Sequence, residues 1–237
     1  MSKETKRIQS VERSFSILEA LSLSEQSLSL QNISEIVALN KTTVHGLLAT
    51  MCALGYVNRT KQGYSLGLRI RELFRPLEQK DEAIRRHFNG LLNQMAQLTN
   101  NTAYLAVKGG EQEYLYIDAI ERQNPLTIRS PRGRREGLAT SAIGKVFLAF
   151  DKELLRQFRL QTSLPPELEK ELSQVLTNGY SLDLEQAEPN LNCLAFPLYM
   201  AGELVAVAGI SGAATELTHQ RLIHFAEVFL KMPNTNS

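Results

Sequence analysis

The sequence predicts an α+β fold with an N-terminal winged helix-turn-helix, a helical linker and a C-terminal domain of strands and helices. Residues 30–66 show two short helical patterns across a tight turn, followed by a hairpin with a polar tip. Residues 68–98 form a long polar helical stretch. From residue 102 onward, helices are set between strand-like runs, which is typical of an α+β domain.

Length and composition bound the class of protein. The 237 residues suffice for one large domain or two ordinary ones. Hydrophobic content is 43%, and no apolar run approaches the ~20 residues that span a bilayer. The polar first ten residues contain no signal-peptide core, and the two cysteines, Cys52 and Cys193, form no disulfide framework. We therefore expect a cytoplasmic protein with no membrane partner.

Charge is unevenly distributed, although the net charge is only +1. Residues 1–75 contain ten Lys and Arg against six Glu, so the remainder of the chain has an acidic excess. This distribution suits a DNA-binding head on a neutral or acidic body.

The first helix is expected to begin with Ser10 as its N-cap and Glu12 in its first turn. Four apolar residues at helical spacing are predicted to face inward. They are Val11, Phe15, Leu18 and Leu21.

The second helix covers about residues 30–37, and residues 38–40 form the turn. The third helix begins at Asn40 or Lys41 and ends near Gly55. Its apolar stripe, with the spacing i, i+3, i+4 and i+7, consists of Val44, Leu47, Leu48 and Met51. The opposite side holds Thr42, His45, Gly46 and Ala49, none of them large or acidic. Such a side suits the major groove, where Thr and His can reach base edges.

Two short strands, about residues 56–59 and 64–66, form the wing after the third helix. The turn at residues 60–63 places Arg59 and Lys61 where a wing contacts phosphate. An ordinary solvated face is the alternative for all of these side chains. The candidate DNA contacts are Lys41, Thr42, Thr43, His45, Thr50, Arg59 and Lys61.

Pro76 lies within the helical stretch of residues 68–98 and is expected to kink or break it. We interpret this stretch as the linker between a first domain, residues 1–67, and a second domain, residues 99–237.

The second domain is predicted to begin with a β-hairpin around Gly109-Gly110. Its strands are residues 104–108, 113–117, 126–130, 193–200 and 203–211. Its helices are residues 141–150, 151–159 and 165–178. A final helix from Thr218 is expected to bury Leu222, Phe225, Ala226 and Phe229.

Six motifs between Ser10 and Lys231 identify a resemblance to a known family. The first three are SVERSFSILEAL, LNKTTVHGLLATMCALGYV and GYSLGLRIREL. The others are GRREGLATSAIGKVFLA, GYSLDLEQAEPNLNCLAFPL and LVAVAGISGAATELT. In this order they resemble the IclR family of bacterial transcriptional regulators.

The resemblance implies a GAF-like second domain that binds a small effector, often an organic or sugar acid. It also implies homodimers or tetramers that bind inverted-repeat operators in double-stranded DNA, and it implies no cofactor. The effector contacts that it implies are Ser141, Ala142 and Ile143 at a helix start, Asp183, Cys193, and Gly209 and Ser211 at a strand end.

Three positions depart from the family's pattern. Gly46 stands where Arg is common, so one phosphate or base contact is absent. Residues 137–139, Gly-Leu-Ala, replace a Pro-Leu-His and remove a polar side chain from the expected pocket. Asn190 replaces a glycine, although Asn also adopts the left-handed conformation.

Local structural roles compete with effector binding. Ser141 could simply cap a helix, but free N–H groups at a helix start also bind carboxylates. Asp183 could be a turn residue. Cys193 in an apolar strand is expected to be a small core residue or pocket wall, because a catalytic thiol requires a His partner. His219 and His224 are five residues apart, a poor spacing for a shared metal, so no metal site is predicted.

A cluster of arginines follows the predicted hairpin. These side chains could attract an acidic effector, pair with Glu121 and Glu136 on the surface, or contact a second subunit; the solvated pairing is favoured. The cluster consists of Arg122, Arg129, Arg132, Arg134 and Arg135.

The sequence therefore predicts a ligand-responsive DNA-binding regulator, a repressor of a small catabolic operon, with no enzymatic activity. An effector that prefers one arrangement of the second domains would change the spacing of the DNA-binding heads. The alternative is a winged-helix protein whose second domain is enzymatic or binds another protein.

Overall fold

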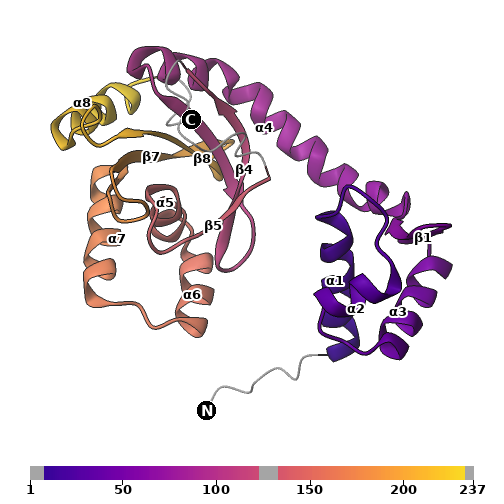
Figure 1. Cartoon of the computed structure of the whole chain (residues 1–237). Helices are drawn as coiled ribbons and strands as arrows, with labels where there is room; N and C mark the ends of the chain where they lie inside the picture. Colours follow the sequence, from indigo (N-terminus) through magenta and orange to yellow (C-terminus); the bar gives the residue numbers. More distant parts are fainter. Residues whose placement is uncertain (1–7, 123–132, 233–237) are drawn as a thin grey trace. The chain divides into compact units, whose positions relative to one another are not determined.

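The computed structural model describes residues 8–122 and 133–232 (Figure 1). The chain divides into two compact units, Met1–Gln79 and Lys80–Ser237. Within the described ranges, no helix has both the length and the apolar character needed to cross a membrane. The strand predicted at residues 126–130 lies outside the described residues.

The first unit is a three-helix cluster with a two-stranded wing. Its helices are α1 (Gln9–Ser22), α2 (Leu30–Ile36) and α3 (Lys41–Ala53), and its antiparallel strands are β1 (Val57–Thr60) and β2 (Gly63–Leu66). The side chain of Asn40 accepts a hydrogen bond from the N–H of Thr43 at 2.8 Å and so caps α3. The core of the unit includes Ile17, Ile33, Val44, Leu48, Val57 and Tyr64.

Helix α1 differs from its prediction in two respects. It begins at Gln9 after Ile8, which offers no side-chain cap, so the assignment of Ser10 as N-cap is wrong. Val11 and Phe15 are 49% and 61% exposed rather than inward-facing. The helix has apolar side chains on two sides, and the side that packs in the core contains Ile17, Ala20 and Leu21.

Helix α4 extends over 31 residues, Arg69–Thr99, and continues through Pro76. Of the two predicted effects of Pro76, the break is therefore wrong, and the kink stays a prediction. Residues 71–80 are all exposed, so water can bond the backbone carbonyl that the missing N–H of Pro76 leaves free. From Ile84 onward the helix is amphipathic, and its apolar side packs in the core of the second unit.

The second unit is built on a six-stranded antiparallel sheet with the order β5-β4-β3-β8-β7-β6. Its strands are β3 (Thr102–Lys108), β4 (Glu113–Ile120), β5 (Arg135–Gly137), β6 (Ser181–Leu184), β7 (Leu191–Met200) and β8 (Glu203–Ala213). The sequence predicted β3, β4, β7 and β8 but neither β5 nor β6. These two missed strands are the edges of the sheet.

Helices cover both faces of this sheet (Figure 1). The second half of α4 and α8 (His219–Phe229) pack on one face, and the four residues predicted to point inward from α8 are buried. The other face packs against α5 (Ala142–Phe150), α6 (Lys152–Gln161) and α7 (Pro166–Asn178). Alternation along β3 sends Leu105 to the first face and Tyr104 to the second.

Candidate functional sites

Helix α3 has the two sides that its sequence predicts. Val44 and Leu48 are fully buried, Met51 is 5% exposed and Leu47 is half-buried. On the opposite side Lys41, Thr42, His45 and Thr50 are exposed and Thr43 is partly exposed. A side chain at Gly46 would meet no atom within 4 Å, so this side of the helix is open along its length.

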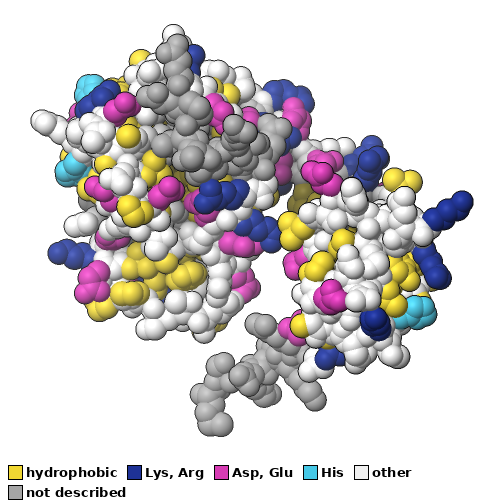
Figure 2. All heavy atoms as spheres, viewed as in Figure 1, with side chains coloured by type: hydrophobic (Ala, Val, Ile, Leu, Met, Phe, Trp, Pro, Cys, Tyr) yellow, Lys and Arg dark blue, Asp and Glu magenta, His cyan; other side chains and the backbone are white. Residues whose placement is uncertain are grey.

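The wing adds exposed positive charge. Arg59 lies in β1 and Lys61 in the turn that follows, and both are exposed. Among the described residues neither forms an ion pair, and Lys41 contacts only the amide oxygen of Gln31, at 3.4 Å. Figure 2 shows Lys, Arg and His side chains on one side of this unit, whose only histidine is His45. Unpaired cations beside a helix with small side chains are suited to a polyanion.

One candidate DNA contact on the exposed side of α3, Thr50, already forms a hydrogen bond within the helix. The hydroxyl of Thr50 donates to the backbone carbonyl of Gly46 at 3.1 Å, within the helix. Its methyl group and the acceptor lone pairs of its hydroxyl oxygen are left free for a base contact.

The second unit contains a cavity of about 250 Å³ on the sheet face that packs against α5. All seven residues that the sequence analysis assigned to an effector site line this cavity: Ser141, Ala142, Ile143, Asp183, Cys193, Gly209 and Ser211. The sheet register explains part of this convergence. Asp183 lies opposite Cys193, which lies opposite Ser211, so three neighbouring strands bring one residue each to the same row.

The start of α5 forms another wall. The hydroxyl of Ser141 accepts the N–H of Gly144 at 3.0 Å, so this serine caps the helix and also lines the cavity. Ile143 reaches the sheet because Gly209 has no side chain; a Cβ there would lie 3.3 Å from the Ile143 Cγ1 atom. A helix start beside a cavity presents backbone N–H groups and the positive end of the helix dipole.

Asp183 has an unsatisfied oxygen. The residue is 1% exposed, and its Oδ1 atom accepts the N–H groups of Gln186 at 2.8 Å and Ala187 at 3.3 Å. Among the described residues its Oδ2 atom has no partner. Burial raises the pKa of this carboxyl group above its usual value, although the two backbone N–H groups oppose the shift. A buried polar atom without a partner in a cavity wall is a binding position for a ligand or water.

Four further lining residues were not identified from the sequence as a group. Tyr114 donates to Glu136 at 2.6 Å and Tyr116 donates to the same carboxylate at 3.1 Å, while Arg134 pairs with it at 3.2 Å. Burial, reinforced by the nearby Glu136, raises the pKa of both phenols, so both hydroxyls keep their protons. The alternation of Tyr114 and Tyr116 in the predicted hairpin was a usable signal. No sequence signal placed Glu136 beside these tyrosines, because Glu136 lies in β5, a strand that the sequence did not predict.

The arginine cluster is thus partly resolved in favour of pairing. Arg134 pairs with Glu136 and also lines the cavity, and Arg135 pairs with Glu113 at 2.9 Å. Arg129 and Arg132 lie outside the described residues.

Cys193 has the environment of an unreactive thiol. Burial raises its pKa, and the neighbouring Asp183 and Glu136 carboxylates raise it further. No histidine lines the cavity. Within residues 8–122 and 133–232, no three His, Cys, Asp or Glu side chains are grouped to hold a metal ion.

The departures from the family's pattern have local consequences. Gly137 lines the cavity, whereas Leu138 is 1% exposed and packs in the core. Asn190 adopts a left-handed conformation with φ of 62°, as expected for a residue that replaces glycine.

Comparison with known proteins covers nearly the whole chain. Residues 10–61 match the family model described as IclR helix-turn-helix domain, and residues 79–234 match the model described as Bacterial transcriptional regulator IclR C-terminal. The chain is 30% identical over 234 residues to the HTH-type transcriptional regulator XynR of Escherichia coli, covering 93% of this chain and 92% of that protein. It is 32% identical over 224 residues to KdgR of Dickeya chrysanthemi, covering 89% and 72%.

Solved structures show the same fold. An IclR homolog from Microbacterium hydrocarbonoxydans, crystallised with 4-hydroxybenzoate, has a TM-score of 0.70 at 19% identity and covers 94% of this chain and 97% of its own. An IclR family transcriptional regulator from Brucella abortus has a TM-score of 0.66 at 22% identity, covering 96% and 93%. XynR, KdgR and the Brucella abortus protein are named as transcriptional regulators rather than enzymes.

Proposed function

Because the chain belongs to the IclR family of bacterial transcriptional regulators, we propose that it is a repressor of a small catabolic operon whose DNA binding responds to a small acid. In this proposal residues 1–67 bind an inverted-repeat operator, and residues 99–237 bind the effector and form the oligomer. Residues 68–98 are the linker between these two domains. The protein would act in the cytoplasm, where its operator is.

A single observation supports the effector site best. Seven residues from four separate segments line one cavity, and one of them, Asp183, has a buried oxygen that no described residue contacts by a hydrogen bond. The start of α5 supplies N–H groups for a carboxylate at the same cavity. At about 250 Å³ the cavity is below the ~300–1,000 Å³ typical of drug-sized ligands, which favours a small organic or sugar acid.

DNA binding is assigned to the open side of α3 and to the wing. Thr42, Thr43 and His45 would reach base edges, while Lys41, Arg59 and Lys61 would contact phosphates. Because half-site spacing on DNA is strict, an effector that favours one arrangement of the second units changes operator affinity.

Exposed apolar side chains support a homo-oligomer. Val11 and Phe15 share one side of α1 with Ile8, and all three are about half exposed or more. Leu73, Phe74 and Leu77 of α4 are likewise exposed. Exposed apolar side chains grouped on one side of a helix mark protein interfaces, so we propose that these surfaces add to the oligomer contacts of residues 99–237 and meet a second copy in a dimer or tetramer. A Phe15→Glu variant that associates as tightly as the wild type in sedimentation equilibrium would contradict the use of α1.

The DNA assignment is tested on the sequence that the protein protects beside its own gene. Thr42→Ala and His45→Ala should each weaken specific binding by about five- to tenfold, the lower part of the ~1–3 kcal/mol that a base contact contributes. Gln26→Ala, at an exposed position in the loop between α1 and α2, is the control. Fluorescence anisotropy measures affinity, and circular dichroism checks the fold. Unchanged affinity in both variants would remove α3 from the interface.

The effector assignment is tested by thermal shift with glyoxylate, pyruvate, gluconate and 4-hydroxybenzoate. A binding acid should raise the melting temperature of the wild type but not of Ser211→Leu, whose side chain fills the cavity. Ser173→Leu on the exposed side of α7 is the control for the same substitution elsewhere. If Ser211→Leu keeps the full shift, the effector binds outside the cavity.

A further inference from the structure

The segment between β6 and β7 closes one side of the cavity without an apolar anchor. Ala187 and Glu188 of this segment line the cavity, beside Asp183 and Leu191 at the strand ends. Residues 184–190 are all exposed, so none of them packs in a core. The position of this segment therefore depends on polar contacts.

Some of these contacts lie within the segment and its flanking strands. Asp183 accepts the N–H groups of Gln186 and Ala187, and Glu185 donates its N–H to the carbonyl of Leu191 at 3.1 Å. The Glu185 carboxylate accepts the N–H of Asn190 at 2.9 Å. These bonds shape the turn, but they do not attach it to the helices behind it.

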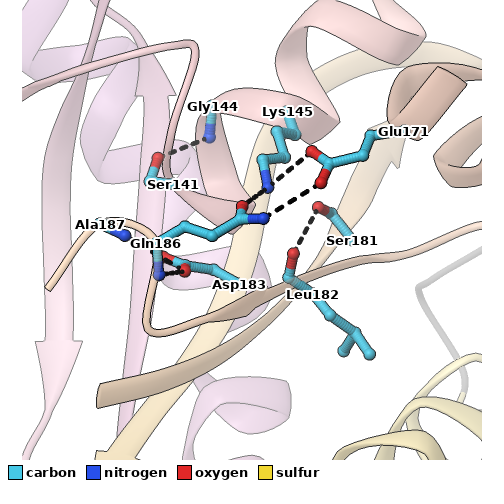
Figure 3. A network of polar contacts seen from close by, with 9 residues as sticks. All are labelled: Ser141, Gly144, Lys145, Glu171, Ser181, Leu182, Asp183, Gln186 and Ala187. Atoms are coloured by element: carbon cyan, nitrogen blue, oxygen red, sulfur yellow. Dashed lines mark hydrogen bonds and ion pairs between the residues drawn. The ribbon is translucent and has the colours of Figure 1, made fainter. Parts of the chain in front are cut away.

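A ring of three side chains makes that attachment (Figure 3). The ammonium of Lys145 on α5 donates to the side-chain oxygen of Gln186 and lies 2.9 Å from a carboxylate oxygen of Glu171 on α7. The side-chain amide of Gln186 donates to the other oxygen of Glu171 at 3.1 Å. We name these three residues the Lys145 ring.

The two charged groups in this ring, the Lys145 ammonium and the Glu171 carboxylate, form an ion pair with each other. Lys145 is 2% exposed, although it carries a charge. Partial burial acts to raise the pKa of Glu171, but the hydrogen bonds from Lys145 and Gln186 outweigh it and hold that pKa below its usual value. A buried ion pair adds little net stability compared with apolar residues of similar size, and what it does provide is a fixed geometry.

The ring also lies next to cavity residues along the chain. Lys145 is one helical turn beyond Ser141, and Gln186 is one of the two residues whose N–H groups orient Asp183. Glu171 does not line the cavity. We propose that Lys145, Gln186 and Glu171 are positioning residues of this cavity, which hold the 184–190 segment in place and thereby close that side and orient Asp183.

The proposal deepens the proposed effector site but can be tested without any effector. Cys193 lines the cavity, and burial, which raises the pKa of its thiol, makes it slow to react in the closed cavity. A faster alkylation of Cys193 by excess iodoacetamide at alkaline pH therefore reports opening of the cavity in the full-length, ligand-free protein. Cys52 lies in the first unit and serves as an internal control, since the two cysteines are distinguished by peptide mass spectrometry.

Gln186→Ala is the main variant, because Gln186 is exposed and its loss leaves the core intact. We expect alkylation of Cys193 to become several-fold faster, alkylation of Cys52 to stay unchanged, and amide hydrogen exchange over residues 184–191 to increase. The matched control is Lys108→Met, which removes the 2.7 Å ion pair with Asp151 in the same unit, outside the cavity lining. Wild-type alkylation and exchange in Gln186→Ala, or an equal increase in Lys108→Met, would overturn the proposal.

An exchange of partners separates positioning from general stability. Glu171→Gln leaves Lys145 without its counter-ion, and Gln186→Glu places a second carboxylate beside Glu171, so each should speed alkylation of Cys193. The double variant Glu171→Gln/Gln186→Glu again gives Lys145 one carboxylate and one amide, and it should return the rate toward that of the wild type. A double variant at least as fast as the faster single variant would contradict the ring. If no acid binds in the thermal-shift panel, these results still stand, so failure of the effector assignment is distinguishable.

Discussion

Three helical glycines should respond to the same substitution in two opposite directions. A Cβ at Gly144 in α5 would lie 2.4 Å from the carbonyl oxygen and 2.5 Å from the Cα of Leu138. Both are backbone atoms, so the helix start or the preceding segment must move. Overpacking of this kind costs ~1–3 kcal/mol, against ~1 kcal/mol that alanine gains over glycine in a helix. Because backbone atoms must move, the cost belongs in the upper part of this range, and we expect Gly144→Ala to lower the free energy of unfolding by about 1–2 kcal/mol.

A Cβ at Gly46 in α3 meets no atom within 4 Å, and the same holds at Gly90 in α4. Gly46→Ala and Gly90→Ala should each stabilise the chain by about 0.5–1 kcal/mol, because only the gain in helix propensity remains. The three variants are compared by urea unfolding of the full chain, with hydrogen exchange to assign each change to its unit. A Gly144→Ala protein as stable as the wild type, or a destabilised Gly46→Ala, would refute the reasoning.

Three other predictions concern the cap of α3, the wing and the cavity. Asn40→Ala removes the acceptor for the Thr43 N–H and should cost about 1 kcal/mol in urea unfolding, whereas Gln62→Ala in the exposed wing turn should cost almost nothing. Arg59→Ala and Lys61→Ala should each reduce the slope of log affinity against log salt concentration by about 1 in operator titrations; a slope equal to that of the wild type would show that the residue contacts no phosphate. Burial raises the pKa of Asp183 in the folded state, so the folded protein binds this proton more tightly than the unfolded chain, and stability is lost as pH rises from the ordinary value of 3.8 through the folded-state pKa. Asp183→Asn should make that loss smaller in unfolding curves measured across this pH range, and an unchanged pH dependence would contradict the assignment.

The sequence predicted most of the elements that are long enough to repeat their apolar pattern several times. The apolar stripe of α3 and the four inward residues of α8 are as predicted, because a helix of 11–13 residues repeats its pattern several times. Strands β5 and β6 have only three and four residues, too few to show an alternation. Helix α1 has two apolar sides, and composition does not say which one packs within the same chain.

The cavity was predictable only in part. Its seven assigned residues came from a family resemblance, and the register Asp183–Cys193–Ser211 explains why they meet. Glu136 and its two tyrosine donors come together across β4 and β5, a pairing that depends on the missed strand. Lys145 and Glu171 are 26 positions apart on different helices, and no local pattern predicts their contact.

The exposed first half of α4 has a consequence for limited proteolysis. Residues 71–80 are all exposed, and isolated helices shorter than ~12–15 residues are marginal in water even without a proline. Trypsin does not cleave the Arg75-Pro76 bond, so in the monomeric protein, where no second copy covers α4, the first cuts are expected after Arg71 or Lys80. A single cut after Lys80 would divide the chain at the boundary of the two units and would remove the covalent connection between them.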